Sequence, residues 1–236
     1  EMVKYATNCF LMTKLLFFNE VYQVCEKLNI DYNKLPELLA YDKRIGKSHL
    51  QVPGPDGKFA ASGSCFPKDI SAFIKIAESV GYDFKLLKAV DEINNNQPLK
   101  FVEKIKIEVG SLKDKKIAVL GLSFKPNTDD IREAPSIKII SQLLDEGASI
   151  SAYDPKAIEN VKKVFGDKIK FTENPYETAK DADILCLLTE WDEFRELDLV
   201  KIKNIMEKPV IFDGRNLYNP EKIRDLGFTY FSIGRP

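Results

Sequence analysis

The hydrophobic pattern of the 236-residue chain changes character between its two halves. The first half carries long stretches with helical spacing. Residues 1–28 are apolar on nearly all sides and contain few helix breakers, which predicts a largely buried helix and a partner surface for it. Lys4, Asn8, Leu15 and Asn19 fall near one face of this helix. Because buried polar groups need partners, the polar members of this set are candidates to face a ligand.

Further helical segments follow this first helix. A short helix is predicted within 31–41, and a loop rich in Pro and Gly follows over 42–64. The next helix should begin at Pro67, a favoured first position, and end at Gly81. A helical pattern then continues over 86–110 and can kink at Pro98. We therefore predict a helical domain over 1–85 and a connecting helix over 86–110.

From Lys115 onward, short apolar runs alternate with helical or turn segments. These runs are typical of strands buried on both faces, and their alternation with helices predicts a parallel, doubly wound sheet. The runs are 117–121, 149–153, 184–188, 210–213 and 228–232. The predicted fold class is α/β, with an all-helical domain joined by a long helix to a Rossmann-like parallel-sheet domain over 111–236.

Charge and composition exclude several classes of protein. The 35 basic and 36 acidic residues give a formal net charge of −1, which argues against a nucleic-acid partner. No apolar stretch reaches the roughly 20 residues of a membrane span, and the opening Glu1-Met2-Val3-Lys4 shows no secretory signal, so no membrane association is expected. Four widely spaced cysteines indicate reduced thiols and a cytoplasmic location. The single histidine, His49, argues against a His-based triad or a multi-His metal site.

Cys65 is the strongest candidate for a chemical role. It follows the small residues Ala60-Ala61-Ser62-Gly63-Ser64 and precedes the helix predicted at Pro67. The helix dipole and the nearby Lys68 both favour a thiolate, so Cys65 is a candidate nucleophile, whereas the other three cysteines fit small buried side chains. Asp69, one helical turn farther on, could act as a base for water. Its alternative interpretation is an acidic first-turn residue that complements the dipole.

A second candidate site follows the first predicted strand. The turn Gly121-Leu122-Ser123-Phe124-Lys125 lies where nucleotides commonly bind to such sheets, although it lacks a G-x-G-x-x-G fingerprint. Lys125 and Arg132, close to the helix that opens at Pro135, could form a phosphate cradle. An ordinary turn followed by a solvated charged loop is the alternative interpretation.

Five motifs in the same order resemble the UDP-glucose 6-dehydrogenase family. They are Glu1-Met2-x-Lys4-Tyr5-x-x-Asn8, Asp42-x-Arg44-Ile45-Gly46, Cys65-Phe66-Pro67-Lys68-Asp69, the segment from Phe124 to Glu133, and Phe212-Asp213-Gly214-Arg215. The resemblance covers the middle and C-terminal portions of the family, so the chain looks like the enzyme without its NAD-binding first domain.

The resemblance implies oxidation of UDP-glucose to UDP-glucuronate by two hydride transfers to two NAD molecules. Cys65 matches the nucleophile that forms a thiohemiacetal and then a thioester, which water hydrolyses. Lys4 and Asn8 match the residues that stabilise developing charge on the sugar oxygen, and Asp69 matches the carboxylate associated with activating water. The chain alone is expected to bind a UDP-sugar without turning it over.

The resemblance also assigns the contacts to cofactor and substrate. Lys68 and Arg132 match residues that reach the NAD, Phe124 and Lys125 match contacts to UDP, and Arg215 matches a contact to the nucleotide sugar. Arg44 matches an arginine supplied to the sugar by the neighbouring subunit, which implies a homodimer through the helical domain.

Some features leave the substrate and the activity open. The family has an aromatic residue and paired glycines where this chain has Ala60-Ala61-Ser62-Gly63-Ser64, while the insert that begins at Val52-Pro53-Gly54 looks more like bacterial UDP-glucose enzymes. The alternatives are a GDP-mannose or UDP-N-acetylmannosamine dehydrogenase, and a non-catalytic nucleotide-sugar-binding dimer module.

Overall fold

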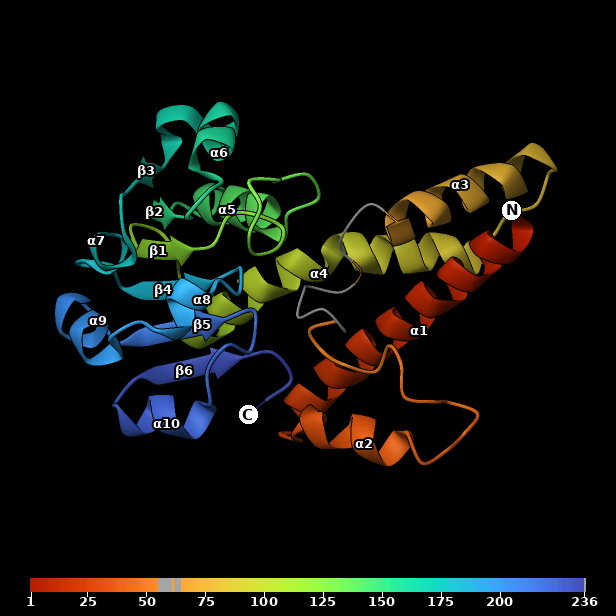
Figure 1. Cartoon of the computed structure of the whole chain (residues 1–236), viewed down its shortest axis with the longest axis horizontal. Coiled ribbons are helices and arrows are strands. Elements are labelled where there is room, and N and C mark those ends of the chain that lie inside the picture. The colour runs from red at the N-terminus through yellow and green to blue at the C-terminus, as the bar shows by residue number, and fades with distance from the viewer. Residues whose placement is uncertain (55–60, 62–64, 236) are drawn as a thin grey trace. The chain divides into compact units, whose positions relative to one another are not determined.

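A computed structural model describes residues 1–54, 61 and 65–235 of the chain (Figure 1). The chain forms two compact units. Unit 1 consists of Glu1–Gln97 together with Gly234–Pro236, and unit 2 consists of Pro98–Ile233. Each unit has its own arrangement of helices and strands, and each is described by itself. None of the helices in the described residues is long and apolar enough to cross a membrane.

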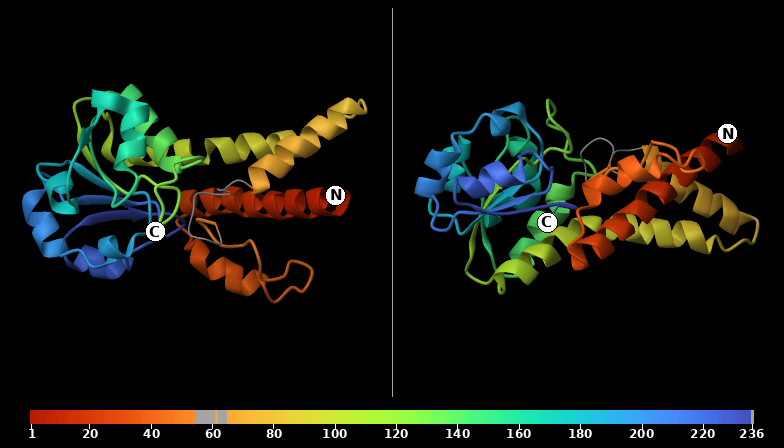
Figure 2. Two further views of the ribbon diagram at one scale, coloured as in Figure 1. Left: turned by 45° about the horizontal axis from the view of Figure 1, so that its top comes forward. Right: turned by 90° about the horizontal axis from the view of Figure 1, so that it is seen from below.

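Unit 1 is helical. Its elements are α1 (Met2–Lys27), the 3-10 helix η1 (Tyr32–Lys34), α2 (Leu35–Leu39), α3 (Cys65–Ser79) and the first half of α4 (Lys85–Val109). α1 packs against α3, where the ring centroids of Tyr5 and Phe73 lie 6.1 Å apart (Figure 2). The core between the helices is apolar and contains Cys9, Met12, Leu15, Leu16, Ala61, Ile70, Leu87 and Val90.

α1 confirms the predicted first helix, but its burial is limited to one face. A row of apolar side chains on the other face is exposed within the chain: Val3 (80%), Phe10 (67%), Phe17 (60%) and Val24 (57%). These residues recur every seven positions, so they lie along one side of the helix. The helix therefore presents an apolar stripe, which we call the α1 stripe, to the exterior of its own chain.

Asn19 corrects the sequence prediction of a ligand-facing polar row. Its side chain is buried, and its amide donates to the Leu15 carbonyl at 2.9 Å. A hydrogen bond to the backbone one turn earlier satisfies this amide inside the helix. Asn19 therefore takes no part in a ligand site, whereas Lys4 and Asn8 lie near the other end of α1.

Three other helix predictions differ in detail. The predicted helix over 31–41 is divided into η1 and α2. α3 begins at Cys65, two residues before the predicted start, because the first turn of a helix tolerates a proline whose missing N–H would have no partner there. α4 contains Pro98 and ends at Val109. Cys65 is consequently the first residue of α3 and not a residue of the preceding loop.

The last described residues of the chain belong to unit 1. The Gly234 amide donates to Glu26 Oε1 at 2.9 Å, and the Gly234 carbonyl accepts from the Tyr32 amide at 3.1 Å. Gly234 has a φ of +67°, and a Cβ there would lie 3.4 Å from the Cβ of Tyr32. A glycine at this position permits both the backbone angle and the close approach.

Unit 2 is built on one parallel sheet of six strands in the order β3-β2-β1-β4-β5-β6 (Figure 1). The strands are β1 (Lys116–Leu120), β2 (Ser149–Tyr153), β3 (Lys170–Phe171), β4 (Ile184–Leu187), β5 (Val210–Asp213) and β6 (Thr229–Ser232). Five of them confirm the predicted runs within one residue at each end. β3 was not predicted, since two residues are too few to show a pattern.

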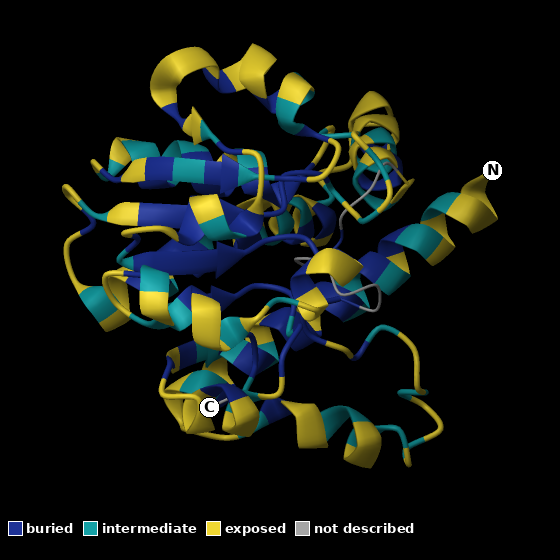
Figure 3. Cartoon of the chain, turned by 60° about the vertical axis from the view of Figure 1, so that its left-hand side comes forward, coloured by how far each residue is buried: buried dark blue, intermediate teal, exposed yellow. Residues whose placement is uncertain are grey.

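Helices cover both faces of the sheet, as a doubly wound fold requires. The connecting elements are α5 (Pro135–Asp145), α6 (Ile158–Phe165), η2 (Gly166–Lys168), α7 (Pro175–Ala179), α8 (Asp192–Arg195), α9 (Leu199–Ile205) and α10 (Pro220–Asp225). On one face, Leu120, Leu187 and Ile211 pack among residues of α8, α9 and α10. On the other, Phe101 of α4 lies edge-on to Phe212, at 6.3 Å between centroids. The central strands β1, β4 and β5 are buried almost throughout (Figure 3), whereas β2, β3 and β6 contain exposed and half-buried residues. Burial on both faces, which was predicted for all five runs, therefore holds only at the centre of the sheet.

Candidate functional site

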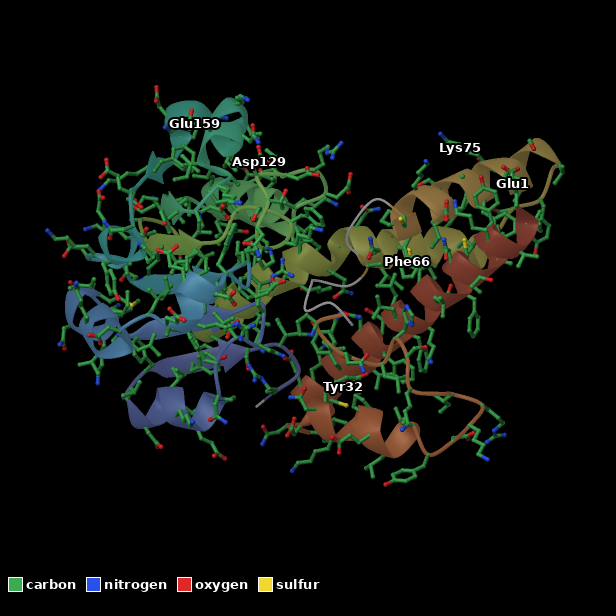
Figure 4. All side chains as sticks on the ribbon, viewed as in Figure 1. Glu1, Tyr32, Phe66, Lys75, Asp129 and Glu159 are labelled. Carbon is green, nitrogen blue, oxygen red and sulfur yellow. The ribbon has the colours of Figure 1, made fainter. Side chains whose placement is uncertain are left out.

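The first turn of α3 carries three of the predicted site residues. Cys65 is exposed, Lys68 is exposed, and Asp69 is buried with 3% of its surface accessible. Figure 4 shows Phe66 at this end of α3, with Lys75 farther along the same helix. Cys65 and Asp69 are four residues apart, so they lie on one face of α3, one turn from each other. The thiol therefore stands at the solvent-exposed start of the helix and the carboxylate lies deeper.

Asp69 collects two polar side chains from α1. Asn8 Nδ2 donates to Asp69 Oδ2 at 2.5 Å, and Lys4 Nζ lies 3.5 Å from Asp69 Oδ1. The spacing of four residues places Lys4 and Asn8 on one face of α1, which is the face toward α3. The structure thus brings together four predicted residues, Lys4, Asn8, Asp69 and, one turn away, Cys65. Asn8 donates one of its two amide hydrogens to the Asp69 carboxylate.

Cys9 lies beside this cluster and differs from Cys65. Cys9 is buried, and burial, with a smaller contribution from the Asp69 charge, raises the pKa of its thiol to about 11. A thiol with such a pKa stays protonated near neutral pH. Cys9 is therefore no rival to Cys65 as a nucleophile, and Cys25 and Cys186 are buried as well.

Arg44 lies in the loop after α2 and bonds to Asp42 of the same loop. Its Nε and Nη2 donate to the Asp42 carboxylate at 3.0 Å and 2.6 Å, and its side chain is 90% exposed. The hydrogen bonds from Arg44 hold the pKa of Asp42 below its usual value. The next residue is attached to α1, because Lys14 Nζ donates to the Ile45 carbonyl at 2.6 Å. The loop thus presents Arg44 outward and not toward the Asp69 cluster of its own chain.

His49 lies in the same loop and is the single histidine of the chain. Its ring is 5.8 Å from that of Phe66, the neighbour of Cys65, and its Nδ1 is buried with no hydrogen-bond partner among the described residues. Burial, and secondarily the charge of Lys14, lower the pKa of His49. The imidazole is therefore held neutral at physiological pH.

The second group of predicted residues lies at the carboxyl edge of the sheet in unit 2. β1 and β4 are adjacent, and the chain leaves them toward opposite sides of the sheet, which makes this edge the topological switch point where α/β sheets bind ligands. Phe124 and Lys125 follow β1, and Lys125 Nζ lies 5.3 Å from the centre of the Phe124 ring. Gly121 begins the turn with a φ of +93°, and a Cβ there would lie 2.5 Å from Thr189.

Asp154, directly after β2, was not singled out from the sequence. It is 1% exposed, and its Oδ2 accepts from the amides of Leu122 and Ser123 at 2.7 and 3.1 Å. Its Oδ1 accepts from the amides of Lys156 and Ala157 at 2.9 and 2.8 Å. In dinucleotide-binding Rossmann domains an acidic residue near this position holds a ribose hydroxyl. Here the carboxylate is committed to protein amides and shapes the turn that leads to Phe124.

Arg132 lies farther along the same loop. Its Nε and Nη2 donate to the Asp130 carboxylate at 3.0 and 2.7 Å, and its side chain is 88% exposed. The hydrogen bonds from Arg132 lower the pKa of Asp130 to about 2. The Asp129 carbonyl accepts from Asn160 Nδ2 at 2.9 Å, which ties the loop to α6. Figure 4 labels Asp129 in this loop and Glu159 on α6. An exposed guanidinium held in this way is chemically suited to an anionic ligand.

Arg215 follows β5 and is buried, with a side chain that is 0% exposed. Its Nε donates to the Leu188 carbonyl at 2.6 Å and lies 3.4 Å from Glu190 Oε2. Its amide donates to Asp213 Oδ1 at 2.8 Å. The sequence singled out Arg215 but not its partner. The signal for Glu190 was its position three residues after the buried strand β4, at the same edge as Lys125 and Arg215.

Parts of the predicted site lie outside the described residues. They are the departure Ala60-Ala61-Ser62-Gly63-Ser64, of which Ala61 alone is described, and the part of the Pro-Gly insert from Pro55 onward. Within residues 1–54, 61 and 65–235, no group of three or more His, Cys, Asp or Glu side chains could hold a metal ion.

The fold and the site define the class of protein. The all-parallel sheet is Rossmann-like, and basic side chains gather after β1 and β5 at its carboxyl edge. Residues 1–96 match the central domain of the UDP-glucose/GDP-mannose dehydrogenase family, and residues 118–220 match its UDP binding domain. The chain belongs to the UDP-glucose/GDP-mannose dehydrogenase family.

Individual relatives agree with this assignment. The UDP-glucose 6-dehydrogenase TuaD of Bacillus subtilis is 43% identical over 236 residues, which are 100% of this chain and 50% of TuaD. The UDP-glucose 6-dehydrogenase of Rhizobium meliloti is 39% identical over 237 residues, covering 100% of this chain and 53% of the relative. The chain thus spans about half the length of these relatives.

Solved structures share the fold. A UDP-glucose dehydrogenase from Pyrobaculum islandicum has a TM-score of 0.81 and 33% identity, with 100% of this chain and 51% of that chain covered. A UDP-D-ManNAc dehydrogenase from Pyrococcus horikoshii has a TM-score of 0.77 at 24% identity, covering 100% of this chain and 51% of the other. The second likeness concerns the fold alone.

Proposed function

We propose that the chain supplies the central and UDP-binding parts of an NAD-dependent UDP-glucose 6-dehydrogenase, which oxidises UDP-glucose to UDP-glucuronate. The observation that carries this proposal is the convergence of Lys4, Asn8 and Asp69 beside the turn of α3 that begins with the exposed Cys65. A nucleophile, two donors and a carboxylate in one place are the groups that a covalent oxidation of an aldehyde needs.

Cys65 is proposed as the nucleophile. Its thiolate adds to C6 of the aldehyde, so that a carbon–sulfur bond forms and the second bond of the carbonyl breaks. The oxygen takes up the proton that the thiol had lost, which gives a thiohemiacetal. Loss of hydride from C6 and of the hydroxyl proton leaves a thioester. Water then breaks the carbon–sulfur bond, which releases the carboxylate and returns the thiol. Capture on sulfur retains the reactive aldehyde between the two oxidations.

Lys4, Asn8 and Asp69 are proposed to act on oxygen and water. Lys4 can donate to the developing negative charge on the sugar oxygen, and Asn8 keeps one amide hydrogen beyond the one that it gives to Asp69. Asp69 can accept a proton from the water that attacks the thioester. The buried carboxylate is held in place for this role by both α1 side chains.

NAD is proposed as the cofactor, and it accepts the two hydrides when bound. The residues present fit contacts to a cofactor that carries phosphates: Lys68 is exposed three residues after Cys65, and Arg132 presents an 88% exposed guanidinium. Both cations are proposed to bind and orient the cofactor. Arg132 must exchange part of its contact with Asp130 for the ligand.

UDP is proposed to bind at the carboxyl edge of the sheet. Phe124 and Lys125 supply a ring and a cation for the UDP moiety, and Arg215 supplies a buried guanidinium for the nucleotide sugar. The Asp154 carboxylate bonds to backbone amides, whereas a dinucleotide-binding sheet uses an acidic residue near this position to hold a ribose hydroxyl. This difference supports a ligand other than a dinucleotide on this sheet. The four free cysteines support a reducing, cytoplasmic location.

A homodimer is proposed through the α1 stripe. Four apolar side chains at seven-residue spacing, each more than half exposed, are costly to leave in water, and a second copy of α1 would cover them. Arg44, whose guanidinium faces outward from its own chain, is proposed to reach the sugar bound to the partner.

The proposed substrate is tested by thermal shift of the purified 236-residue chain. UDP-glucose should raise the melting temperature, with a stabilisation of about 2.7 kcal/mol at a concentration 100 times the dissociation constant. GDP-mannose and UDP-N-acetylmannosamine should give smaller shifts. An equal or larger shift with either would assign the chain to that alternative. The chain by itself is proposed to reduce no NAD with UDP-glucose, and turnover at an enzyme-like rate would contradict this.

The proposed nucleophile is tested by the rate of alkylation near pH 7. Cys65 is exposed while the other cysteines are buried, so a faster rate than theirs shows only access. An activated Cys65 should react with iodoacetamide faster in the folded chain than in the urea-unfolded chain, where all four thiols are accessible. An equal or slower rate in the folded chain would favour the non-catalytic module. Cys65→Ser identifies the signal, and in an enzyme that includes an NAD-binding domain it should abolish acid formation.

A further inference from the structure

Thr189, Glu190 and Trp191, which begin two residues after β4, touch both halves of the proposed UDP site. Thr189 Oγ1 donates to the Ser123 carbonyl at 2.6 Å, and Trp191 Nε1 donates to Asp154 Oδ2 at 3.1 Å. Glu190, between them, lies 3.4 Å from Arg215 Nε. Three consecutive side chains therefore contact the segments after β1, β2 and β5.

Thr189 and Trp191 act on the turn that leads to Phe124 and Lys125. The Ser123 carbonyl is held by Thr189, and the Ser123 amide is held by the carboxylate that Trp191 also contacts. Thr189 is 0% exposed and fills the space beside Gly121, so the turn and the segment after β4 are packed backbone to backbone. The backbone at the start of this turn is therefore held in place without a ligand.

Glu190 acts on Arg215. A guanidinium that is 0% exposed carries a charge that burial disfavours unless a carboxylate lies nearby. The Nε hydrogen of Arg215 is directed to the Leu188 carbonyl, and Glu190 Oε2 accepts no hydrogen bond from the described residues, so the Glu190 contact is one of charge. Its effect is to hold the guanidinium in one orientation at the sheet edge.

We propose that Thr189, Glu190 and Trp191 form a positioning segment that holds the Phe124–Lys125 turn and Arg215 in a binding geometry for the UDP-sugar. The inference rests on the proposed function, and it adds three residues that act through others without touching the ligand. A preorganised site binds more tightly because it loses less conformational freedom when the ligand arrives.

The experiment measures UDP affinity of the purified chain by calorimetry. Thr189→Val keeps the shape and removes the hydroxyl, and Glu190→Gln removes the charge. Each should raise the dissociation constant for UDP about 10-fold, the change expected from one lost hydrogen bond or ion pair of about 1.4 kcal/mol. Trp191 is the only tryptophan of the chain, so its fluorescence gives a second measure of binding in both variants.

Two control variants separate positioning from general stability. Thr178→Val removes a buried hydroxyl of α7 that bonds to Thr172, which follows the edge strand β3 and not β1, β4 or β5. Glu193→Gln neutralises an exposed carboxylate that accepts from the Tyr153 hydroxyl at 3.2 Å. Both should leave the UDP dissociation constant within about 2-fold of wild type, even where Thr178→Val lowers the melting temperature.

A double-mutant cycle tests whether Glu190 works through Arg215. Glu190→Gln should weaken UDP binding in the wild-type background and have less than a 2-fold effect when Arg215→Gln is already present. If wild-type chain binds UDP and Thr189→Val and Glu190→Gln bind it equally well, or if the Glu190 effect persists without Arg215, the positioning segment is refuted and the proposed function stands. Failure of the wild-type chain to bind UDP overturns the proposed function and, with it, this inference.

Discussion

Replacing Asn8 with alanine should destabilise the packing of α1 against α3 by about 1–2 kcal/mol. Asn8 donates at 2.5 Å to Asp69, which is 3% exposed. A hydrogen bond to a charged group contributes about 1.5–3 kcal/mol, and the better helix propensity of alanine offsets up to about 0.7 kcal/mol of the loss. Lys4 does not compensate, because its side chain is 67% exposed and an exposed ion pair contributes at most about 1 kcal/mol.

Hydrogen exchange of the α1 and α3 amides under increasing urea measures this loss within unit 1. Thr7→Ala, at an exposed position of α1, is the matched control and should lose no stability. Asp69→Asn completes a double-mutant cycle, in which we expect a coupling of about 1.5 kcal/mol or more between Asn8 and Asp69. Effects that add to within about 0.5 kcal/mol would show that Asn8 does not hold the carboxylate.

Three further predictions concern other parts of the chain. Phe17→Lys should turn the proposed dimer into a monomer in sedimentation velocity, because covering a phenylalanine that is 60% exposed contributes about 3 kcal/mol per protomer, and an unchanged sedimentation coefficient would contradict the α1 stripe as the interface. Gly121→Ala should cost about 3 kcal/mol in urea unfolding, since its Cβ would lie 2.5 Å from Thr189 at a φ of +93°, and a loss below about 1 kcal/mol would refute the close packing. The pKa of His49 is lowered in the folded chain, so the imidazole of the unfolded chain binds a proton more readily. The free energy of unfolding should therefore be at its full value above pH 6.5 and should decrease as the pH falls below 6.5. His49→Gln should flatten thermal stability just below pH 6.5, and an unaltered pH profile would exclude His49 as the cause.

Periodicity predicted the elements that are long or continuously apolar. Residues 1–28 formed α1, and five apolar runs formed strands of the parallel sheet, because each pattern extends over enough residues to distinguish a helix from a strand. β3 has two residues and shows no pattern. Asn19 looked like a ligand-facing residue because spacing along a helix does not show whether a polar side chain bonds to its own backbone.

The candidate site could be predicted where two of its residues lie four positions apart on the same helix. Lys4 and Asn8 share a helix face, and so do Cys65 and Asp69, but the hydrogen bond between Asn8 and Asp69 joins residues 61 positions apart in the sequence. The roles of Asp154 and Glu190 depend on which strands are neighbours. The order β2-β1-β4-β5 brings the segments after these strands together, and no local pattern contains that order.

The return of Gly234 to unit 1 has a consequence for how the chain can be shortened. The Gly234 backbone bonds to Glu26 and to Tyr32, so two residues near the beginning of the chain depend on one near its other end. A truncation after Ile233 would leave the whole sheet of unit 2 intact and would remove the partner of the Tyr32 amide, which lies next to a fully buried ring. Such a truncation should therefore destabilise the helices of unit 1 and not the sheet of unit 2.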